Sequence, residues 1–193
     1  SNVFTFREQV HAAYIQFRSF TGDKEKPSWK YDVGLRGEQV WNNGQAATNN
    51  VSFSNIYFNL FPTANISYYK TPDEFLKLSY SRRINRPGLG QLNPFIDIAD
   101  SLNKHAGNPY LKPELVHSLE WGYNKEWSKL SVYTTLFYRN ATNTIRQFTV
   151  LFPNGVALTQ PVNIGNATTY GLENIIIARP FHKYDVNLSL SFF

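Results

Sequence analysis

The sequence predicts an all-β protein, an antiparallel transmembrane β-barrel with about eight strands in this chain. Eight stretches alternate apolar and polar residues, which is the period of a strand with one apolar and one polar face. The connections between them run alternately short and long, like the turns and loops at the two ends of a membrane barrel. The last stretch is the most regular, with Tyr184, Val186, Leu188, Leu190 and Phe192 on one face and Asp185, Asn187, Ser189 and Ser191 on the other.

Composition favours a barrel over a bundle of transmembrane helices. The chain has 193 residues, of which 16% are aromatic, and its mean hydropathy is −0.38. A transmembrane helix needs about 18 or more consecutive apolar residues, and the longest apolar runs, such as 175–178, are far shorter. Because a barrel strand is apolar on one face only, a polar average with many aromatic residues is typical of this class.

Charge and cysteine content exclude several functions. The absence of cysteine excludes disulfides and thiolate metal sites. The net charge is +5, but lysine and arginine are scattered along the predicted strands instead of forming a basic stripe, which argues against nucleic-acid binding. The chain begins at Ser1 without a methionine or a signal peptide, so we expect that an export signal was removed or that this is a piece of a longer protein.

The expected strands differ in regularity. In the first, residues 4–20, the parity of the apolar residues changes between Tyr14 and Ile15, and we expect a bulge that switches the two faces. In the third, residues 53–69, Pro62 removes a ladder hydrogen bond and predicts a local irregularity. The other strands are expected at 29–38, 76–83, 114–123, 130–139 with a continuation to about 150, 166–178 and 184–192, with short turns at 22–27, 70–74, 124–128 and 180–183.

The long connections are expected to be irregular external loops. One polar loop begins at Asn42-Asn43-Gly44 and reaches about residue 50. The longest covers residues 84–113 and contains four prolines and three glycines, so regular structure is not expected there. Aromatic residues gather beside the short turns, which is typical of a girdle at the membrane interface; they are Trp29, Tyr31, Tyr68, Phe75, Trp121, Tyr123, Trp127, Phe181 and Tyr184.

Five short motifs, taken in order, resemble a known family. The two longest are Ser79-Tyr80-Ser81-Arg82-Arg83-Ile84-Asn85-Arg86-Pro87 and Gly107-Asn108-Pro109-Tyr110-Leu111-Lys112-Pro113-Glu114. The others are Gly34-Leu35-Arg36-Gly37-Glu38, Leu60-Phe61-Pro62 and Tyr170-Gly171-Leu172-Glu173. With these motifs the chain resembles the barrel region of TonB-dependent outer-membrane receptors of the Bacteroidetes type, over roughly residues 6–179.

The resemblance implies a barrel of about 22 strands with an N-terminal plug in its lumen. Receptors of this kind capture a scarce nutrient, such as a siderophore, sugar or peptide, and admit it when TonB transmits energy to the plug. The implied partners are outer-membrane lipid, the rest of the same receptor, TonB through regions outside this chain, and the nutrient. We therefore expect residues 1–193 to be part of the barrel domain, without the plug, and the protein not to be an enzyme.

The candidate ligand-binding residues are Arg83 and Arg86, which lie with Arg82 at the start of the longest loop. A cluster of arginines there could attract an anionic substrate such as an iron chelate. The alternative is structural, with the arginines paired to Glu114, to Glu120 or to anionic lipid headgroups. Pro87 and the Gly107-Asn108-Pro109 turn are expected to shape the loop.

No metal, cofactor or catalytic site is expected. Asp97 and Asp100 provide too few oxygen ligands for calcium, which needs about six to eight. The four histidines, at positions 11, 105, 117 and 182, show no ligand spacing. Ser118 and His117 cannot act as a catalytic pair because neighbours on a strand face opposite ways.

Two other interpretations of the alternation stay open. Eight strands can also close into a complete small barrel with an anchoring or adhesion role, and in that case the first strand would pair with the eighth. A soluble β-sandwich binding module is the second alternative, although strands of ten or more residues are long for one.

Overall fold

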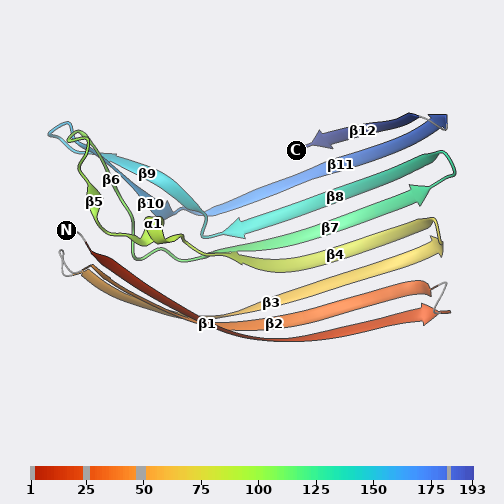
Figure 1. The fold of residues 1–193 in the computed structure, drawn as a ribbon, viewed down its shortest axis with the longest axis horizontal. Coiled ribbons are helices and arrows are strands. Elements are labelled where there is room, and N and C mark those ends of the chain that lie inside the picture. The colour runs from red at the N-terminus through yellow and green to blue at the C-terminus, as the bar shows by residue number, and fades with distance from the viewer. Residues whose placement is uncertain (1–2, 24–26, 47–50, 182–183) are drawn as a thin grey trace.

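The computed structural model describes residues 3–23, 27–46, 51–181 and 184–193 (Figure 1). Eight long strands form one antiparallel sheet, in which each pairs with the next long strand along the chain. Within the described residues, no helix is long and apolar enough to cross a membrane. In spatial order the strands are β1 (Phe4–Gly22), β2 (Pro27–Ala46), β3 (Val51–Thr71), β4 (Glu74–Asn85), β7 (Glu114–Glu126), β8 (Leu130–Thr142), β11 (Asn166–Phe181) and β12 (Tyr184–Phe192).

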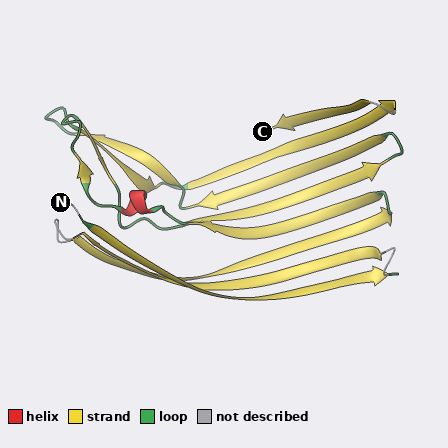
Figure 2. Cartoon of the chain, viewed as in Figure 1, coloured by secondary structure: helices red, strands yellow, loops and turns green. Residues whose placement is uncertain are grey.

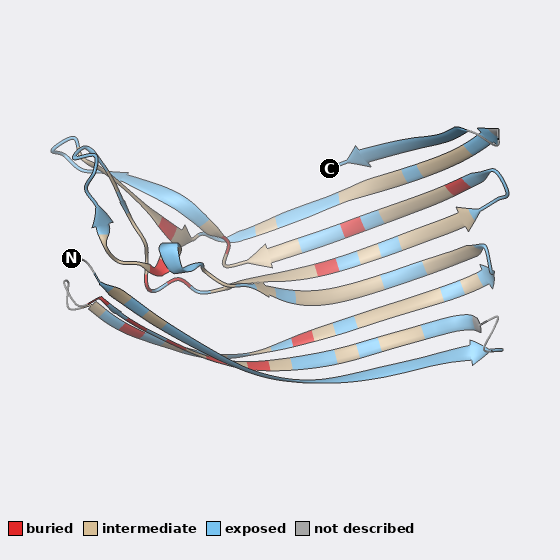
Figure 3. Cartoon of the chain, viewed as in Figure 1, coloured by how far each residue is buried: buried red, intermediate tan, exposed pale blue. Residues whose placement is uncertain are grey.

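The two faces of this sheet differ as the alternation predicts. In the register, Leu78 lies opposite Trp121, which lies opposite Leu136, so apolar residues of neighbouring strands share one face. These three residues, like Leu188 and Leu190 of β12, are between 40% and 47% exposed. Figure 3 shows that burial along the long strands is confined to a few positions. We call the apolar face the outer face. The opposite face carries the alternating polar residues, and we call it the inner face. The outer face is uncovered, as contact with lipid requires.

The sheet is open, which is the expected architecture for part of a larger barrel. Strands β1 and β12 lie at its opposite edges, and within the described residues β1 pairs only with β2 and β12 only with β11. The complete eight-stranded barrel considered from the sequence is therefore wrong, because its first and last strands would be paired. A soluble sandwich is also wrong, because within the described chain no second layer covers the outer face.

Strand β1 keeps one register with β2 from Phe4 to Thr21, so the bulge expected within this strand is wrong. Ile15 lies opposite Leu35 and belongs to the outer face, which places Tyr14 on the inner face. Both faces of β1 carry apolar residues, and for this reason parity alone did not identify its faces.

Strands β2 and β3 form a longer hairpin than expected. Asn42, Asn43 and Gly44 continue β2 instead of starting a loop, and Gly44 lies opposite Phe53. A Cβ at position 44 would collide with the ring of Phe53, so the glycine makes room for this packing. The end of the predicted loop, residues 47–50, lies outside the described residues.

Pro62 marks the point where β3 loses one of its two neighbours. The ladder between β3 and β4 ends at the pair Thr63 and Ser81, whereas the ladder between β3 and β2 continues without a break. Pro62 would be next to pair with Arg82, and proline has no N–H to donate. The side chain of Arg82 reaches across instead, and its Nη1 donates to the carbonyl of Leu60 at 3.1 Å. The predicted irregularity at Pro62 is confirmed.

The two long connections are structured and joined to each other, contrary to expectation. We call 86–113 and 143–165 the outer segments; they lie together at one end of the main sheet (Figures 1 and 2). They form a four-stranded sheet in the order β5-β6-β10-β9, in which β6 and β10 are parallel. The elements are α1 (Leu89–Leu92), β5 (Ile96–Asp97), β6 (Asn103–Ala106), β9 (Ile145–Leu151) and β10 (Ala157–Asn163).

The expected continuation of the sixth strand to about residue 150 is also wrong. Strand β8 ends at Thr142, and Asn143 has a φ of 56°, a left-handed conformation that breaks the strand. Strand β9 then begins at Ile145 and pairs with β10 in the second sheet. Residues 147–150 alternate polar and apolar side chains, so the pattern could not reveal the change of sheet.

A small apolar core lies where the outer segments meet the main sheet. It consists of Phe53 from β3, Leu92 from α1 and Leu111 from the end of the first outer segment, all buried. Phe4, Phe6 and Ile145 pack against it, with the rings of Phe4 and Phe6 each 6.3 Å from that of Phe53. Its members come from five different parts of the chain, so it fixes their relative positions.

The opposite end of the sheet carries the short turns and a group of aromatic residues. The rings of Trp29 and Tyr68 lie 4.7 Å apart, and Tyr31 stacks on Trp29 at 6.1 Å. Phe75 differs from the predicted girdle, because it lies next to inner-face Tyr69 at 5.0 Å. The predicted girdle residue Phe181 has no described side chain, and the turn residues His182 and Lys183 lie outside the described residues.

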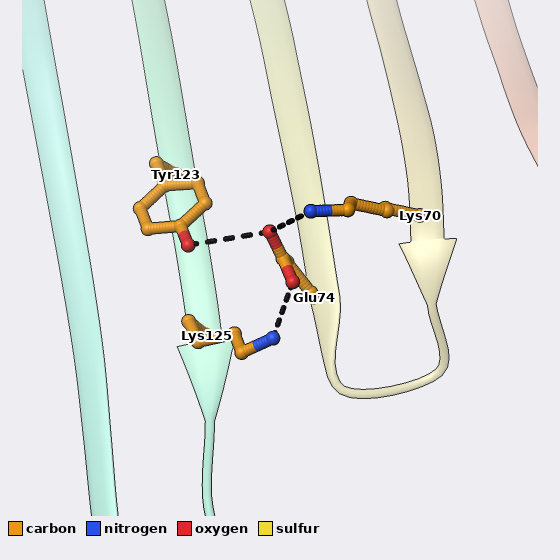
Figure 4. Close-up of polar contacts among 4 residues, drawn as sticks. All are labelled: Lys70, Glu74, Tyr123 and Lys125. Atoms are coloured by element: carbon orange, nitrogen blue, oxygen red, sulfur yellow. Dashed lines mark hydrogen bonds and ion pairs between the residues drawn. The ribbon is translucent and has the colours of Figure 1, made fainter.

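An ion cluster joins three strands beside these turns (Figure 4). The Glu74 carboxylate, at the start of β4, accepts hydrogen bonds from Lys125 of β7 and from Lys70 of β3, the latter at 3.4 Å. The Tyr123 hydroxyl donates to the same carboxylate at 3.4 Å. Lys125 Nζ also lies 5.5 Å from the ring of Trp127. Paired lysines beside aromatic rings are suited to the boundary between lipid and water.

Candidate ligand-binding site at the long-loop end

A buried carboxylate on the inner face of β2 binds two arginines. The side chain of Glu38 is 5% exposed; its Oε1 lies 2.6 Å from Arg36 Nη2, and its Oε2 binds Arg86 Nη2. Arg36 reaches Glu38 because residues two apart on a strand share a face. Arg86 directly follows β4, at the foot of the first outer segment. The Glu38–Arg86 pair therefore connects the first outer segment to the main sheet.

Two further polar groups complete this cluster. Tyr57 of β3 lies beside Arg86 and Asn42. The Tyr57 hydroxyl and Arg86 Nε are both buried and form no hydrogen bond within the described residues. Because buried polar groups are usually paired, these two atoms are the ones best placed to bind a polar group of a ligand. We call Arg36, Glu38, Asn42, Tyr57 and Arg86 the inner cluster.

The inner cluster borders a cavity between β3 and the first outer segment. The cavity has a volume of about 620 Å³, and Asn42 and Tyr57 contribute to its lining. Its other walls are formed by residues of β3 and of the first outer segment, including Leu92 and Leu111 of the apolar core, with Leu115 of β7 and Asn143. The site therefore combines an apolar wall with a few polar groups, as ligand sites generally do.

The structure separates the three arginines that are adjacent in the sequence. Arg86 joins the inner cluster. Arg83 lies opposite Val116 and is exposed on the inner face, where it forms no hydrogen bond or ion pair with the described residues. Arg82 lies opposite His117 and belongs to the outer face. Thus the two predicted ligand-binding residues share a face, and the third does not.

The structural alternative for these arginines holds for Arg86, with a different partner. Glu114 and Glu120 were the expected carboxylates, but Glu120 pairs with Arg139 at 3.5 Å. Glu114 accepts hydrogen bonds from Asn85 and from the backbone of Ile145. Glu38, the actual partner, was not predicted from the sequence, although the motif Arg36-Gly37-Glu38 places two charges on the inner face.

The motif Gly107–Glu114 binds the outer segments to each other. The backbone N–H of Gly107 donates to Asn93 O at 2.9 Å, and the side chain of Asn108 donates to Pro161 O of β10 at 3.2 Å. A Cβ at position 107 would lie 2.7 Å from Gln91 O. This glycine is therefore required for the close approach of two backbones, and the turn shapes the loop as expected.

The second half of the motif is held by one asparagine. Asn163 Oδ1 accepts from the N–H of Lys112 at 2.8 Å, and its Nδ2 donates back to the carbonyl of Lys112 at 2.9 Å. The same Nδ2 donates to Asn143 O at 2.7 Å. The side chain of Asn163 therefore makes the hydrogen bonds to the backbone that a neighbouring strand would otherwise make between the two outer segments. We call Asn108 and Asn163, with their backbone partners, the loop clamp.

The acidic residues of the first outer segment stabilise its turns. Asp97 Oδ1 accepts from the N–H of Ala99, and Asp100 accepts from the N–H groups of Leu102 and Asn103. The side chain of Asn103 is the largest influence that lowers the pKa of Asp100, followed by these backbone donors. Within the described residues, no group of three or more histidine and acidic residues is placed to hold a metal ion.

Comparisons with known proteins identify the family. The model of the outer membrane protein beta-barrel family matches residues 1–193. The chain belongs to this family. No curated protein matches it. Family membership places the chain in the outer membrane, and its uncovered outer face is consistent with that location.

Solved structures show the same fold. The chain is similar to the siderophore receptor PirA from Pseudomonas aeruginosa, with a TM-score of 0.64 and 15% identity over 99% of this chain and 43% of that one. It is similar to the copper transporter OprC, with a TM-score of 0.75 and 13% identity over 96% and 28%. For the FrpB iron transporter from Neisseria meningitidis the values are 0.63 and 17% over 95% and 25%.

These similarities confirm the resemblance noted from the sequence at the level of the fold. The chain spans less than half the length of each of these three proteins. An open sheet of eight strands with two unpaired edges is consistent with one part of a larger barrel. All three are receptors or transporters by name.

Proposed function

We propose that this chain forms part of the barrel wall and outer mouth of a TonB-dependent receptor that takes up a nutrient across the outer membrane. The supporting observation is the open eight-stranded sheet, which has a lipid-facing side and structured outer segments and belongs to an outer-membrane barrel family. The remaining strands, the plug and the segment that contacts TonB lie in regions outside residues 1–193.

The inner face supports a transport role over simple anchoring. A small anchoring barrel needs only a filled interior, whereas this sheet is open and carries an inner cluster beside a cavity at the long-loop end. Arg83 and Arg86 are proposed to contact the incoming nutrient. Arg83 is exposed and unpaired within the described chain, and Arg86 offers its Nε.

Uptake by cells tests this function directly. A strain lacking the full-length gene should lose growth on one class of limiting nutrient, and the gene in trans should restore it. Accumulation of that nutrient should stop when the proton-motive force is dissipated, because TonB draws on it. Normal uptake of every nutrient class in the deletion strain, together with a loss of surface adhesion, would favour the anchoring role instead.

The arginines are tested in the same strain. Arg83→Gln should raise the nutrient concentration needed for half-maximal uptake about threefold to tenfold, as expected for one charged contact. Arg139→Gln is the matched control, since this inner-face arginine pairs with Glu120 and should leave uptake unchanged. Equal effects of the two variants would show that Arg83 has no specific contact.

A further inference from the structure

On the N-terminal side of Pro62, one edge of β3 has no neighbouring strand at the long-loop end of the proposed receptor. Residues 51–62 of β3 pair with β2 only, because the ladder to β4 ends at Thr63. A membrane strand needs about 9–11 residues to cross the hydrocarbon, and Leu60 lies that far from the short turn at Thr71. The free edge therefore lies at and above the outer boundary of the bilayer, where unpaired backbone groups are tolerated.

Side-chain hydrogen bonds show which backbone groups point to this edge. Gln39 Nε2 donates to both Val40 O and Tyr57 O, which are opposite each other, so Tyr57 directs its backbone groups to β2. Leu60 directs its carbonyl the other way, to Arg82. Residues of the same parity as Leu60 therefore present their N–H and C=O groups to the free edge. They include Ser54, Ile56 and Phe58, and within the described residues nothing pairs with their backbone on that side.

The 620 Å³ cavity runs along this free edge. Six consecutive residues of β3, from Ser54 to Asn59, line it, so its length follows the strand. The facing wall contributes apolar residues, among them Leu111 and Pro113. Asn55 and Asn59 add amide side chains, and Lys112 is the one charged residue in the lining. The cavity is therefore long, weakly charged and lined on one side by unpaired strand backbone.

We propose that this cavity binds an extended, uncharged peptide, which adds to β3 as a new strand. Backbone groups repeating every second residue match another extended polypeptide, and the apolar wall accepts its alternate side chains. A sugar or a catechol chelate has no backbone with that repeat, and a multiply charged chelate would face only one charge in the lining. The inference deepens the proposed function, because the peptide would be the imported nutrient or part of it.

Proline substitutions test the edge without disturbing the wall. Ile56→Pro removes an N–H from the free edge and leaves the ladder to β2 intact, as native Pro62 does at the same parity. Ile56→Ala is the matched control, because it removes the side chain, which is 65% exposed, and keeps the N–H. The probe is a pool of blocked five-residue peptides of alternating leucine or valine and serine or asparagine, added to the full-length protein in outer-membrane vesicles.

Ile56→Pro should weaken binding of this pool about fivefold to tenfold, and Ile56→Ala by less than about twofold. N-methylation of alternate peptide nitrogens should abolish binding. Amide exchange at Ser54, Ile56 and Phe58, whose N–H groups face the free edge, should be fast in the free protein and slow with peptide. Equal binding by both variants, or slow exchange without peptide, would overturn the proposal, since another part of the protein would then occupy the edge.

The outcome separates this inference from the proposed function. No binding of the pool at millimolar concentration, or displacement of it by neutral oligosaccharides, overturns the peptide site. If the full-length gene still restores energy-dependent uptake of another nutrient to the deletion strain, the receptor function stands without the peptide site. If the full-length gene restores energy-dependent uptake of no nutrient class to the deletion strain, both the peptide site and the receptor function are overturned.

Discussion

At the scale of single residues, the buried charge of Glu38 holds the first outer segment against strand β2. Its carboxylate is enclosed by Arg36 and Arg86, which come from a strand and from the foot of an outer segment. The arginines are only partly covered, with 54% of Arg36 and 27% of Arg86 exposed, so removing the carboxylate costs about as much as a hydrogen bond between charged groups, about 2 kcal/mol. A surface pair contributes at most about 1 kcal/mol.

Glu38→Gln should therefore lower the free energy of unfolding of the full-length protein by about 2 kcal/mol. Urea unfolding in detergent micelles measures the change. Glu120→Gln is the matched control, because Glu120 lies on the same face but is 40% exposed and pairs at 3.5 Å; it should cost less than about 1 kcal/mol. If both variants unfold at the same urea concentration, the Glu38 cluster has no special role in stability.

Gly107 makes a second prediction at this scale. A Cβ there would meet carbonyl oxygens of Gln91 and Asn93, which are backbone atoms and cannot move aside cheaply. Gly107→Ala should open the outer segments to limited proteolysis while the barrel still forms. Gly90→Ala, in α1, is the control because a Cβ at that position meets nothing within 4 Å. Cleavage at the same rate in both variants would contradict the close approach.

Asp100 gives a local dependence on pH. Its hydrogen bonds to Asn103 and to backbone N–H groups lower its pKa, so the charged form stabilises this turn. The stabilisation is present above the pKa of an unfolded aspartate, about 4, and is lost as the pH falls through the lower folded pKa. Amide protection factors at Leu102 should drop in acid in the wild type and stay flat in Asp100→Asn. A flat profile in both proteins would show that the carboxylate charge is unimportant there.

At the scale of elements, the two outer segments act as one unit. Strands β6 and β10 pair directly, and the loop clamp adds side-chain bonds between segments that are far apart in the sequence. Asn163→Ala removes bonds to Lys112 and Asn143 together, so both segments should become more susceptible to protease at the same time. The control is Asn154→Ala, because Asn154 bonds only within its own turn. Cleavage of one segment alone would indicate that they move separately.

Sequence patterns predicted some of these elements and missed others. Alternation identified all eight long strands, because one face of each must meet lipid. It could not reveal that residues 145–151 leave the main sheet, since a strand alternates in whichever sheet it joins. Prolines and glycines in 84–113 indicated a loop and hid β5 and β6, which are short strands: β6 pairs with β10, and β5 pairs with β6. The Glu38–Arg86 pair joins residues 48 positions apart, and nothing local in the sequence specifies such a contact.

At the scale of the whole molecule, the open sheet sets a condition for folding. Strands β1 and β12 each have one unpaired edge. In hydrocarbon no water satisfies those backbone groups, and each unsatisfied group costs several kcal/mol. Along β12 the outer face is apolar, so this edge runs through the membrane. Neighbouring strands of a larger barrel are therefore needed to pair these two edges and stabilise the eight strands.

Residues 1–193 alone should accordingly fail to form a stable barrel in a bilayer. Refolded into detergent micelles or lipid vesicles, they should give no heat-modifiable monomer on gel electrophoresis and no cooperative unfolding transition. The full-length protein, treated in the same way, should show both, because its closing strands pair with β1 and β12. A cooperative, heat-modifiable monomer from these residues alone would mean that the two edges find each other, and the placement of this chain in a larger barrel wall would have to be abandoned.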